Sequence, residues 1–434
     1  MKFFKTSFIF LLTIILSTST FAKEKVIFWY SLSGQLQKSL INMVDSYNAS
    51  QDKIEIEAIF QGSYEESIAK FKAVSGTKEA PAIVQMNDIS TAFMYKSGAI
   101  TPIEKFIKED NFNIDNLEDV LLNYYRINGD LYSMPFNSSS AILVYNKEAF
   151  KKAGLNPENP PKNYSDILKY SEKLTLKDDK GITKQFGFSM IMYGWFIEQL
   201  LANENNLYVN ENNGRDGKSP TKVAYENELP NILSWLRDIY SNGYGTSYGR
   251  EWSSTRTAFS SGKVAMYLDS SAGLRGVINN AKFEVGTGFI PNKSGEFNGS
   301  IIGGASLWIT NSVNETNQKA AWDFIKYTTS KDVQSTWAIN TGYYPVNKLS
   351  YNTKEMIDNM NKFPQFKTAI EEIQATKENS QTQGAILGVF PEVREKMVQA
   401  MENNYEEKGS VENITKRVAK ESNRIIKRFN RINK

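Results

Sequence analysis

Carboxylates, serines and arginines must carry any chemistry that this chain performs, because its 434 residues include no histidine and no cysteine. Histidine is the commonest general base and the commonest transition-metal ligand in proteins. Its absence excludes Ser-His-Asp catalysis, Cys-His catalysis and an ordinary zinc site. Carboxylate chemistry, serine-lysine chemistry and binding without chemistry remain open, and we expect no metal and no organic cofactor.

Three carboxylates near aromatic residues, Glu65, Glu66 and Asp88, raise the hypothesis of an exported glycoside hydrolase. Adjacent residues on a helix point about 100° apart, so Glu65 and Glu66 are poorly placed as an acid and a nucleophile across one bond. Acidic residues in the first turn of a helix complement its dipole, which explains both residues better. We therefore expect no glycoside hydrolase activity.

A leader is predicted at residues 1–22, because Lys2 and Lys5 precede an apolar core of about nine residues and a small-residue stretch that ends at Ala22. A core of that length is too short to span a bilayer as a helix, which needs about 20 residues. Cleavage after Ala22 would expose no cysteine for a lipid anchor. We expect an exported protein that diffuses freely in a periplasm.

The charge balance argues against a nucleic-acid partner. The formal net charge of +3 falls to about +1 when the leader is removed, so no general basic field exists. One basic segment, about residues 410–434, predicts a helix whose inward face carries Ile414, Val418, Ile425 and Phe429. Its outward face is basic, and we interpret it as solvated surface. The outward residues are Lys416, Arg417, Lys420, Arg424, Lys427 and Arg428.

Strands and helices alternate along the chain. Residues 25–30, 54–60 and 81–86 predict strands, and an apolar stripe from Leu36 to Tyr47 predicts a helix between the first two. The same alternation recurs at strands 141–146 and 305–309, with a helix that begins near residue 165 after Asn163 or Ser165 as its cap. A mature chain of roughly 410 residues is too long for one core. These features predict two α/β domains with parallel sheets.

Several segments, in the same order along nearly the whole mature chain, resemble the periplasmic solute-binding proteins of ABC importers, and most closely those that bind sn-glycerol 3-phosphate. They include Phe28-Trp29, Pro135-Phe136-Asn137-Ser138-Ser139, Tyr145-Asn146-Lys147, Gly194-Trp195, Ile301-Ile302-Gly303-Gly304-Ala305-Ser306-Leu307-Trp308 and Thr341-Gly342-Tyr343.

The resemblance implies the two-lobe periplasmic-binding-protein fold of type II, with a ligand cleft between lobes that crossing hinge segments join. Lobe 1 would comprise residues 23–137 with about 306–350, and lobe 2 residues 138–305 with about 351–434. The protein would be a monomer that binds a phosphorylated polyol without chemical change. It would deliver this ligand to the membrane permease and ATPase subunits of the importer.

The resemblance also implies eight ligand-binding residues, whose types suit glycerol 3-phosphate or a glycerophosphodiester. A phosphate binds guanidinium, hydroxyl and backbone N–H donors well. The residues expected at the phosphate are Ser139, Ser270, Gly304, Tyr343 and Arg394. Tyr64 and Asp88 would hold the glycerol hydroxyls, and Trp195 would cover the C–H face of the ligand.

Two observations bear on the choice of ligand. Met192 stands where the family has a second tryptophan beside Trp195, so an aromatic enclosure for the quaternary ammonium of glycerophosphocholine is weakened. The alternative within the family is a sugar or oligosaccharide receptor. Arg394 speaks against that alternative, because a guanidinium buried in the cleft without an anion is costly.

Overall fold

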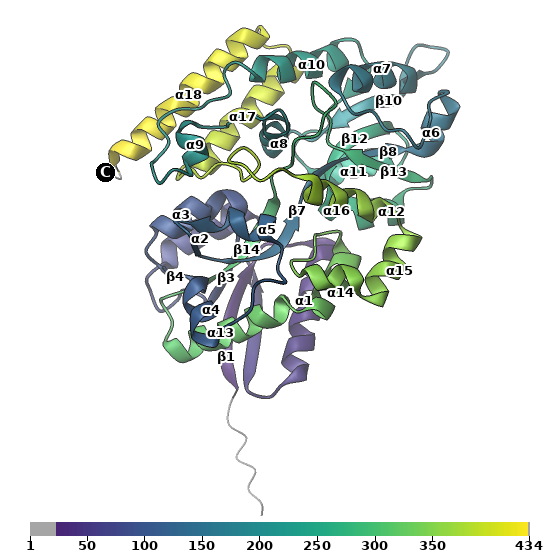
Figure 1. The fold of residues 1–434 in the computed structure, drawn as a ribbon. Helices are drawn as coiled ribbons and strands as arrows, with labels where there is room; N and C mark the ends of the chain where they lie inside the picture. The colour runs from purple at the N-terminus through teal and green to yellow at the C-terminus, as the bar shows by residue number, and fades with distance from the viewer. Residues whose placement is uncertain (1–22, 433–434) are drawn as a thin grey trace, which may run out of the picture.

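The computed structural model describes residues 23–432, and the predicted leader lies outside the described residues. The chain is an α/β protein with two main mixed sheets, one in each of two lobes (Figure 1). Within residues 23–432, no helix combines the length and the apolar character needed to cross a membrane.

The first lobe is built on a sheet with the order β2-β1-β3-β14-β4, in which β7 also pairs with β14. Its strands are β1 (Glu24–Tyr30), β2 (Ile54–Phe60), β3 (Ile83–Asn87), β4 (Ile100–Thr101), β7 (Met134–Ser139) and β14 (Gly303–Thr310). Its helices are α1 (Gly34–Ser50), α2 (Tyr64–Val74), α3 (Thr91–Lys96), α4 (Ile103–Asp110), α5 (Asp119–Tyr124), α13 (Glu315–Thr328), α14 (Lys331–Thr341) and α15 (Lys354–Lys362).

The second lobe is built on a sheet with the order β11-β10-β12-β8-β13. Its strands are β8 (Ala141–Asn146), β9 (Leu176–Lys177), β10 (Thr183–Met190), β11 (Gly245–Thr246), β12 (Val264–Ser270) and β13 (Val285–Phe289). Its helices are α6 (Lys147–Lys152), α7 (Tyr164–Leu174), α8 (Trp195–Asn203), α9 (Asn210–Gly214), α10 (Leu229–Ser241), α11 (Trp252–Ser260), α12 (Leu274–Asn280), α16 (Gln365–Ala375), α17 (Phe390–Tyr405) and α18 (Val411–Ile432).

Several predicted elements are confirmed. The apolar stripe of α1 places Leu40, Met43, Val44 and Tyr47 in the core. Helix α7 begins after Asn163, whose side chain caps it by accepting a hydrogen bond from the backbone N–H of Asp166. The basic C-terminal segment forms α18 with its apolar face inward.

The prediction of parallel sheets is wrong for both lobes. Strands β1, β2 and β3 pair in parallel, but β14 runs antiparallel to β3, β4 and β7, and β8 runs antiparallel to β12 and β13. Parallel neighbours need a crossover connection within one lobe. Strands β8 and β14 instead enter their sheets directly from the other lobe, so that constraint does not fix their direction. The residue boundaries proposed for the lobes stay a prediction.

One buried carboxyl, that of Glu372 on α16, joins three segments at the junction of the lobes. It accepts hydrogen bonds from the Ser140 hydroxyl at 2.5 Å and from the backbone N–H of Ile290 at 2.9 Å. Ser140 is the single residue between β7 and β8, and Ile290 follows β13. Tyr344, which follows α14, donates to the Ser140 hydroxyl. Burial raises the pKa of Glu372 to about 8.

Candidate functional site

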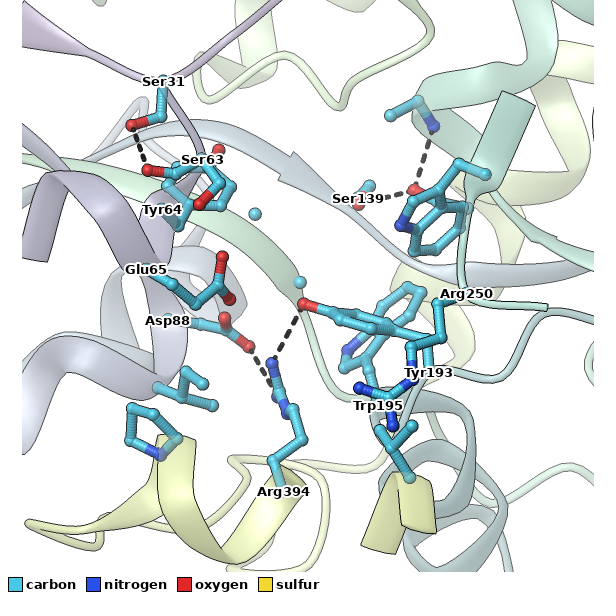
Figure 2. A pocket seen from close by; sticks show the side chains of 18 of the residues that line it. Ser31, Ser63, Tyr64, Glu65, Asp88, Ser139, Tyr193, Trp195, Arg250 and Arg394 are labelled. Carbon is cyan, nitrogen blue, oxygen red and sulfur yellow. Dashed lines mark hydrogen bonds and ion pairs between the residues drawn. The ribbon is translucent and has the colours of Figure 1, made fainter. Parts of the chain in front are cut away.

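A cavity of about 1020 Å³ opens between the two lobes. Three groups of first-lobe residues line it: 31–36 after β1, 63–65 at the start of α2, and 88–89 after β3. The second lobe contributes residues 192–195, 250–256 and 391–398. The cavity therefore lies where both lobes can contact one ligand (Figure 2).

All eight residues predicted at the ligand line this cavity, although they are spread over more than 300 positions of the chain. They are Tyr64, Asp88, Ser139, Trp195, Ser270, Gly304, Tyr343 and Arg394. Their part in ligand binding stays a prediction.

Tyr64 is held by a chain of hydrogen bonds that starts on β3. The Gln85 amide donates to the Asn137 side chain at 2.8 Å, and the Asn137 amide donates to the Tyr64 hydroxyl at 3.1 Å. Burial raises the pKa of Tyr64 well above its ordinary value, so the phenol keeps its proton. Because its oxygen already accepts from Asn137, that proton can be donated toward a ligand.

Two further hydroxyl side chains meet where the two sheets approach one another. Ser139 ends β7 and Ser270 ends β12, and the Ser270 hydroxyl donates to that of Ser139 at 2.9 Å. Tyr343 stacks on Trp337 with the ring planes 4° apart, and burial raises its pKa to about 12. The cavity thus contains these three hydroxyl groups in addition to the Tyr64 phenol, and they suit an oxygen-rich ligand.

Only glycine fits at position 304 of the first sheet. Its φ of +108° is unusual for residues with side chains, and a Cβ at this position would lie 1.8 Å from the carbonyl oxygen of Asn137. The neighbouring Gly303 makes room for the Trp195 ring, because a Cβ there would lie 2.6 Å from that ring. Both glycines therefore shape the cavity wall.

Arg394 is buried and already paired. Its guanidinium donates to both carboxylate oxygens of Glu198 at 2.7 Å and to the Tyr193 hydroxyl at 3.3 Å. Its Nη2 atom also lies 3.6 Å from a carboxylate oxygen of Asp88. We expected Arg394 to need an anionic ligand for its charge, but Glu198 neutralises it within the protein.

Asp88 lies farther from this guanidinium than Glu198 does, at 3.6 Å rather than 2.7 Å. Burial raises the pKa of Asp88 to about 6, although Arg394 acts to lower it and Glu198 adds to the increase. Its charge can therefore change near neutral pH. Protonation of Asp88 would leave the Arg394–Glu198 pair without net charge, whereas ionised Asp88 makes this end of the cavity negative.

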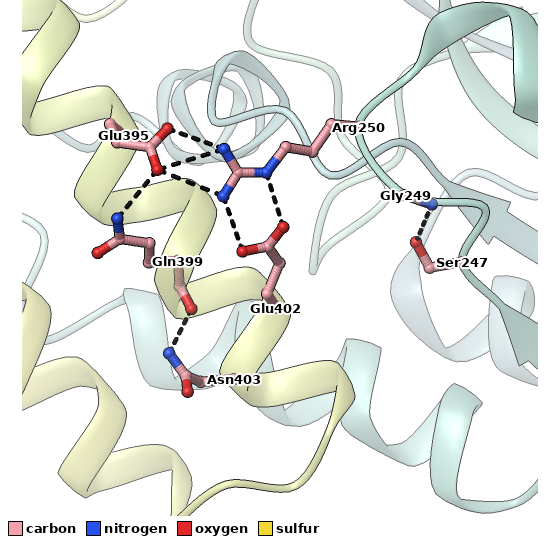
Figure 3. Close-up of polar contacts among 7 residues, drawn as sticks. All are labelled: Ser247, Gly249, Arg250, Glu395, Gln399, Glu402 and Asn403. Carbon is pink, nitrogen blue, oxygen red and sulfur yellow. Dashed lines mark hydrogen bonds and ion pairs between the residues drawn. The ribbon is translucent and has the colours of Figure 1, made fainter.

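Two other arginines line the cavity, and carboxylates also hold them. Arg256 forms a bidentate pair with the buried Asp269, with Nη2–Oδ1 and Nε–Oδ2 distances of 2.8 and 3.0 Å. Arg250 lies at the mouth and bonds to Glu395 and Glu402 on α17 (Figure 3). Any anionic ligand must therefore compete with these carboxylates for the guanidinium groups.

An aromatic wall lies on the second-lobe side. Trp252 packs against Tyr193 and Trp195 with ring centroids 5.4 and 6.5 Å apart, and the Arg256 guanidinium lies over the Trp252 ring. Met192 lines the cavity next to these rings. The aromatic surface is therefore larger than the Met192 position alone suggested.

Sequence reasoning missed Tyr193, Glu198, Trp252 and Arg256. Only Glu198 had a visible signal, because it is an acid within the apolar run of α8, all nine residues of which are buried. A buried acid needs a partner, and that partner is Arg394. Among residues 23–432, no cluster of three or more acidic side chains is arranged to hold a metal ion.

Comparison with known proteins gives consistent results. A profile of the family described as "Bacterial extracellular solute-binding protein" matches residues 42–365. The sn-glycerol-3-phosphate-binding periplasmic protein UgpB of Yersinia pestis is 31% identical, over 99% of this chain and 98% of that protein. UgpB of Shigella flexneri is 30% identical over 94% and 93%.

Solved structures share the fold. UgpB from Mycobacterium tuberculosis in complex with glycerophosphocholine matches with a TM-score of 0.79 and 19% identity, over 93% of this chain and 98% of that one. The cyclic alpha-maltosyl-1,6-maltose binding protein from Arthrobacter globiformis matches with a TM-score of 0.75 and 19% identity, over 94% and 100%. At such identities the likeness shows the fold alone.

Proposed function

Because this chain belongs to the bacterial extracellular solute-binding protein family, we propose that it captures sn-glycerol 3-phosphate, and also glycerophosphodiesters, in a periplasm. The chain is a solute-binding protein of an ABC importer and not an enzyme. Closure of the lobes over the ligand would precede its delivery, by a monomer, to the permease and ATPase subunits.

The observation that carries this proposal is the 31% identity to the sn-glycerol-3-phosphate-binding protein of Yersinia pestis over nearly the full length of both chains. The cavity supports it in a second way. Tyr64 and Asp88 come from the first lobe and Ser270 and Arg394 from the second, so one small ligand could hold the lobes together.

For the phosphate end of the ligand, we assign hydrogen-bond donors rather than an unpaired positive charge. Ser139, Ser270 and Tyr343 supply hydroxyl groups, and Arg394 supplies the guanidinium face that Glu198 does not occupy. Asp88 would accept hydrogen bonds from the glycerol hydroxyls, and Tyr64 would donate a hydrogen bond to them. Because Asp88 is a short acid, its contact with a diol could pass through a water molecule.

A sugar or oligosaccharide is the second candidate ligand, and one observation favours it. Arg250, Arg256 and Arg394 are all paired with carboxylates, while Tyr193, Trp195 and Trp252 form an aromatic wall. Aromatic faces suit the C–H surfaces of sugars, and paired arginines need no anionic ligand.

Isothermal calorimetry on residues 23–434 with glycerol 3-phosphate, glycerophosphocholine, maltose and inorganic phosphate separates these candidates. We expect binding of glycerol 3-phosphate and none of maltose. Ser139→Ala with Ser270→Ala should weaken phosphate-ester binding about tenfold or more. Ser189→Ala, a buried serine of β10 outside the cavity, should leave it unchanged. Binding of maltose alone would replace the phosphate proposal with the sugar receptor.

A further inference from the structure

A continuous stripe of basic side chains runs along the outer face of α18. At 100° per residue its seven members lie within an arc of about 120° and span about 22 Å of the helix. All seven are exposed: Lys416, Arg417, Lys420, Arg424, Lys427, Arg428 and Arg431. We call this set the basic stripe.

The protein neutralises little of the basic stripe, in which Lys416 is attracted by Glu412. None of its seven members forms an ion pair or a hydrogen bond with the described residues. Of the two acids on α18, Glu421 pairs with Lys396 of α17, and Glu412 lies in the first turn. With seven cations and two acids, α18 carries a net charge of +5, whereas the whole chain carries only +3. The remainder of the chain is therefore net negative.

The position of α18 leaves the basic stripe open to a large partner. Its apolar face packs on α10 and α17. Figure 1 shows α18 along the outer edge of the second lobe, with no element outside it. A straight helix of 22 residues, about 33 Å long, presents these charges along a line. This geometry suits an extended surface better than a small ion.

A groove of about 220 Å³ lies beside the basic stripe, between α17 and α18. Arg417 of the stripe, Lys396, Gln399 and Asn403 line it, together with the acid Glu421. Lys396 bonds to Gln399 at 3.1 Å and to Glu421 at 3.4 Å. Two cations and two amides around a groove of this size suit one phosphate group of a larger anionic surface.

We propose that the basic stripe docks this protein on a membrane that contains anionic phospholipids. The core of a specific protein interface is depleted in charged residues and is built around aromatic anchors. The stripe contains no aromatic residue, and its attraction needs only a plane of negative charge. The proposal is independent of which solute the cleft binds, and ligand binding and membrane docking can therefore be tested separately.

The test is co-sedimentation of residues 23–434 with vesicles of phosphatidylcholine that contain or lack phosphatidylglycerol. We expect binding only to the anionic vesicles, and its loss at high salt, because salt screens exposed charges. The variant Lys420→Glu/Arg424→Glu/Lys427→Glu should bind them at least tenfold more weakly. The control Lys169→Glu/Lys173→Glu/Lys177→Glu makes the same charge change on the far side of the second lobe, and it should bind like the unchanged protein.

Equal binding by the stripe variant and the control, or no binding of the unchanged protein to anionic vesicles, would overturn the proposal. A third result would also overturn it: loss of solute uptake by the stripe variant when the permease is reconstituted in purely neutral lipid. The stripe would then dock on a protein. Calorimetry with glycerol 3-phosphate should be unchanged in both variants. This readout also shows that both variants are folded.

Discussion

Asp88 and Arg394 belong to different lobes, and their side chains approach to 3.6 Å across the cleft. Glu198, in the same lobe as Arg394, accepts hydrogen bonds at 2.7 Å from Nε and from the same Nη2 atom that lies near Asp88. Arg394 thus has one carboxylate partner in its own lobe and one across the cleft. A ligand that enters between Asp88 and Arg394 would replace the weaker of these two contacts and leave the stronger one in place.

The Arg394–Glu198 pair should have separable effects on stability and on binding. Arg394→Ala leaves the buried Glu198 carboxylate unpaired, and we expect a loss of about 3–5 kcal/mol in urea unfolding. The double variant Arg394→Met/Glu198→Leu should recover most of that stability, because the buried Glu198 carboxylate is removed together with its partner. Phosphate-ester binding, measured by calorimetry, should be lost in both variants. Undiminished binding in the double variant would remove Arg394 from the ligand site.

Asp88 should make the binding of an anion depend on pH. Its pKa of about 6 means that it gains a proton, and loses its negative charge, as the pH falls through that value. We therefore expect affinity for glycerophosphoglycerol, a phosphodiester of constant charge, to rise roughly threefold to tenfold from about pH 7.5 to about pH 5.5. Asp88→Asn should flatten this profile. A flat profile in the unchanged protein would contradict the assignment of the phosphate to Arg394, which lies 3.6 Å from Asp88.

Glu372 should make the protein less stable as the pH rises. Its pKa is about 8 when folded and 4.5 when exposed, so between these values the folded state holds a proton that the unfolded state has released. Its stabilising contribution is complete below about pH 4.5 and is lost as the pH rises through 8, with a slope of at most about 1.4 kcal/mol per pH unit.

Urea unfolding of Glu372→Gln across this range should lack that slope. The matched control is Glu371→Gln, which changes the exposed neighbour on the same helix. It should retain the slope of the unchanged protein. Identical pH profiles for the two variants would mean that Glu372 is already ionised in the folded protein.

Gly304 should not tolerate even a methyl group. Gly304→Ala combines an unfavourable φ of +108° with a Cβ that would meet the Asn137 carbonyl, so the pairing of β14 with β7 must shift. We expect thermal unfolding to show a loss of more than about 1 kcal/mol, and weaker ligand binding because Asn137 orients Tyr64. Gly276→Ala is the control, since a Cβ there has open space. Equal melting temperatures for both variants would be the contrary result.

The eight cavity residues could be found from sequence because an ordered resemblance places each one without knowledge of its neighbours. Their electrostatic partners could not. Glu198 is far from both Asp88 and Arg394 in the chain, and only folding brings these three side chains together. Tyr193 and Trp252 likewise form one wall from two distant segments.

Local patterns predicted individual elements well, as α1 and α7 show, because apolar spacing and a capping residue act over one or two turns. They did not predict strand direction. The orientation of β8 is set by its direct continuation from β7 through Ser140, which is a property of the junction between lobes. Glu372 could not be recognised as part of that junction for the same reason.

The junction at Glu372 has a practical consequence for measurement. Three segments meet at one buried point, and we expect them to act as a single pivot, so one distance across the cleft mouth should describe how far the lobes rotate. Ser33 and Glu251 are exposed on opposite lips of the cavity. The chain has no thiol of its own, and cysteines introduced at these two positions would be the only sites for dyes. Energy transfer between the dyes would make the protein an optical sensor for its own solute.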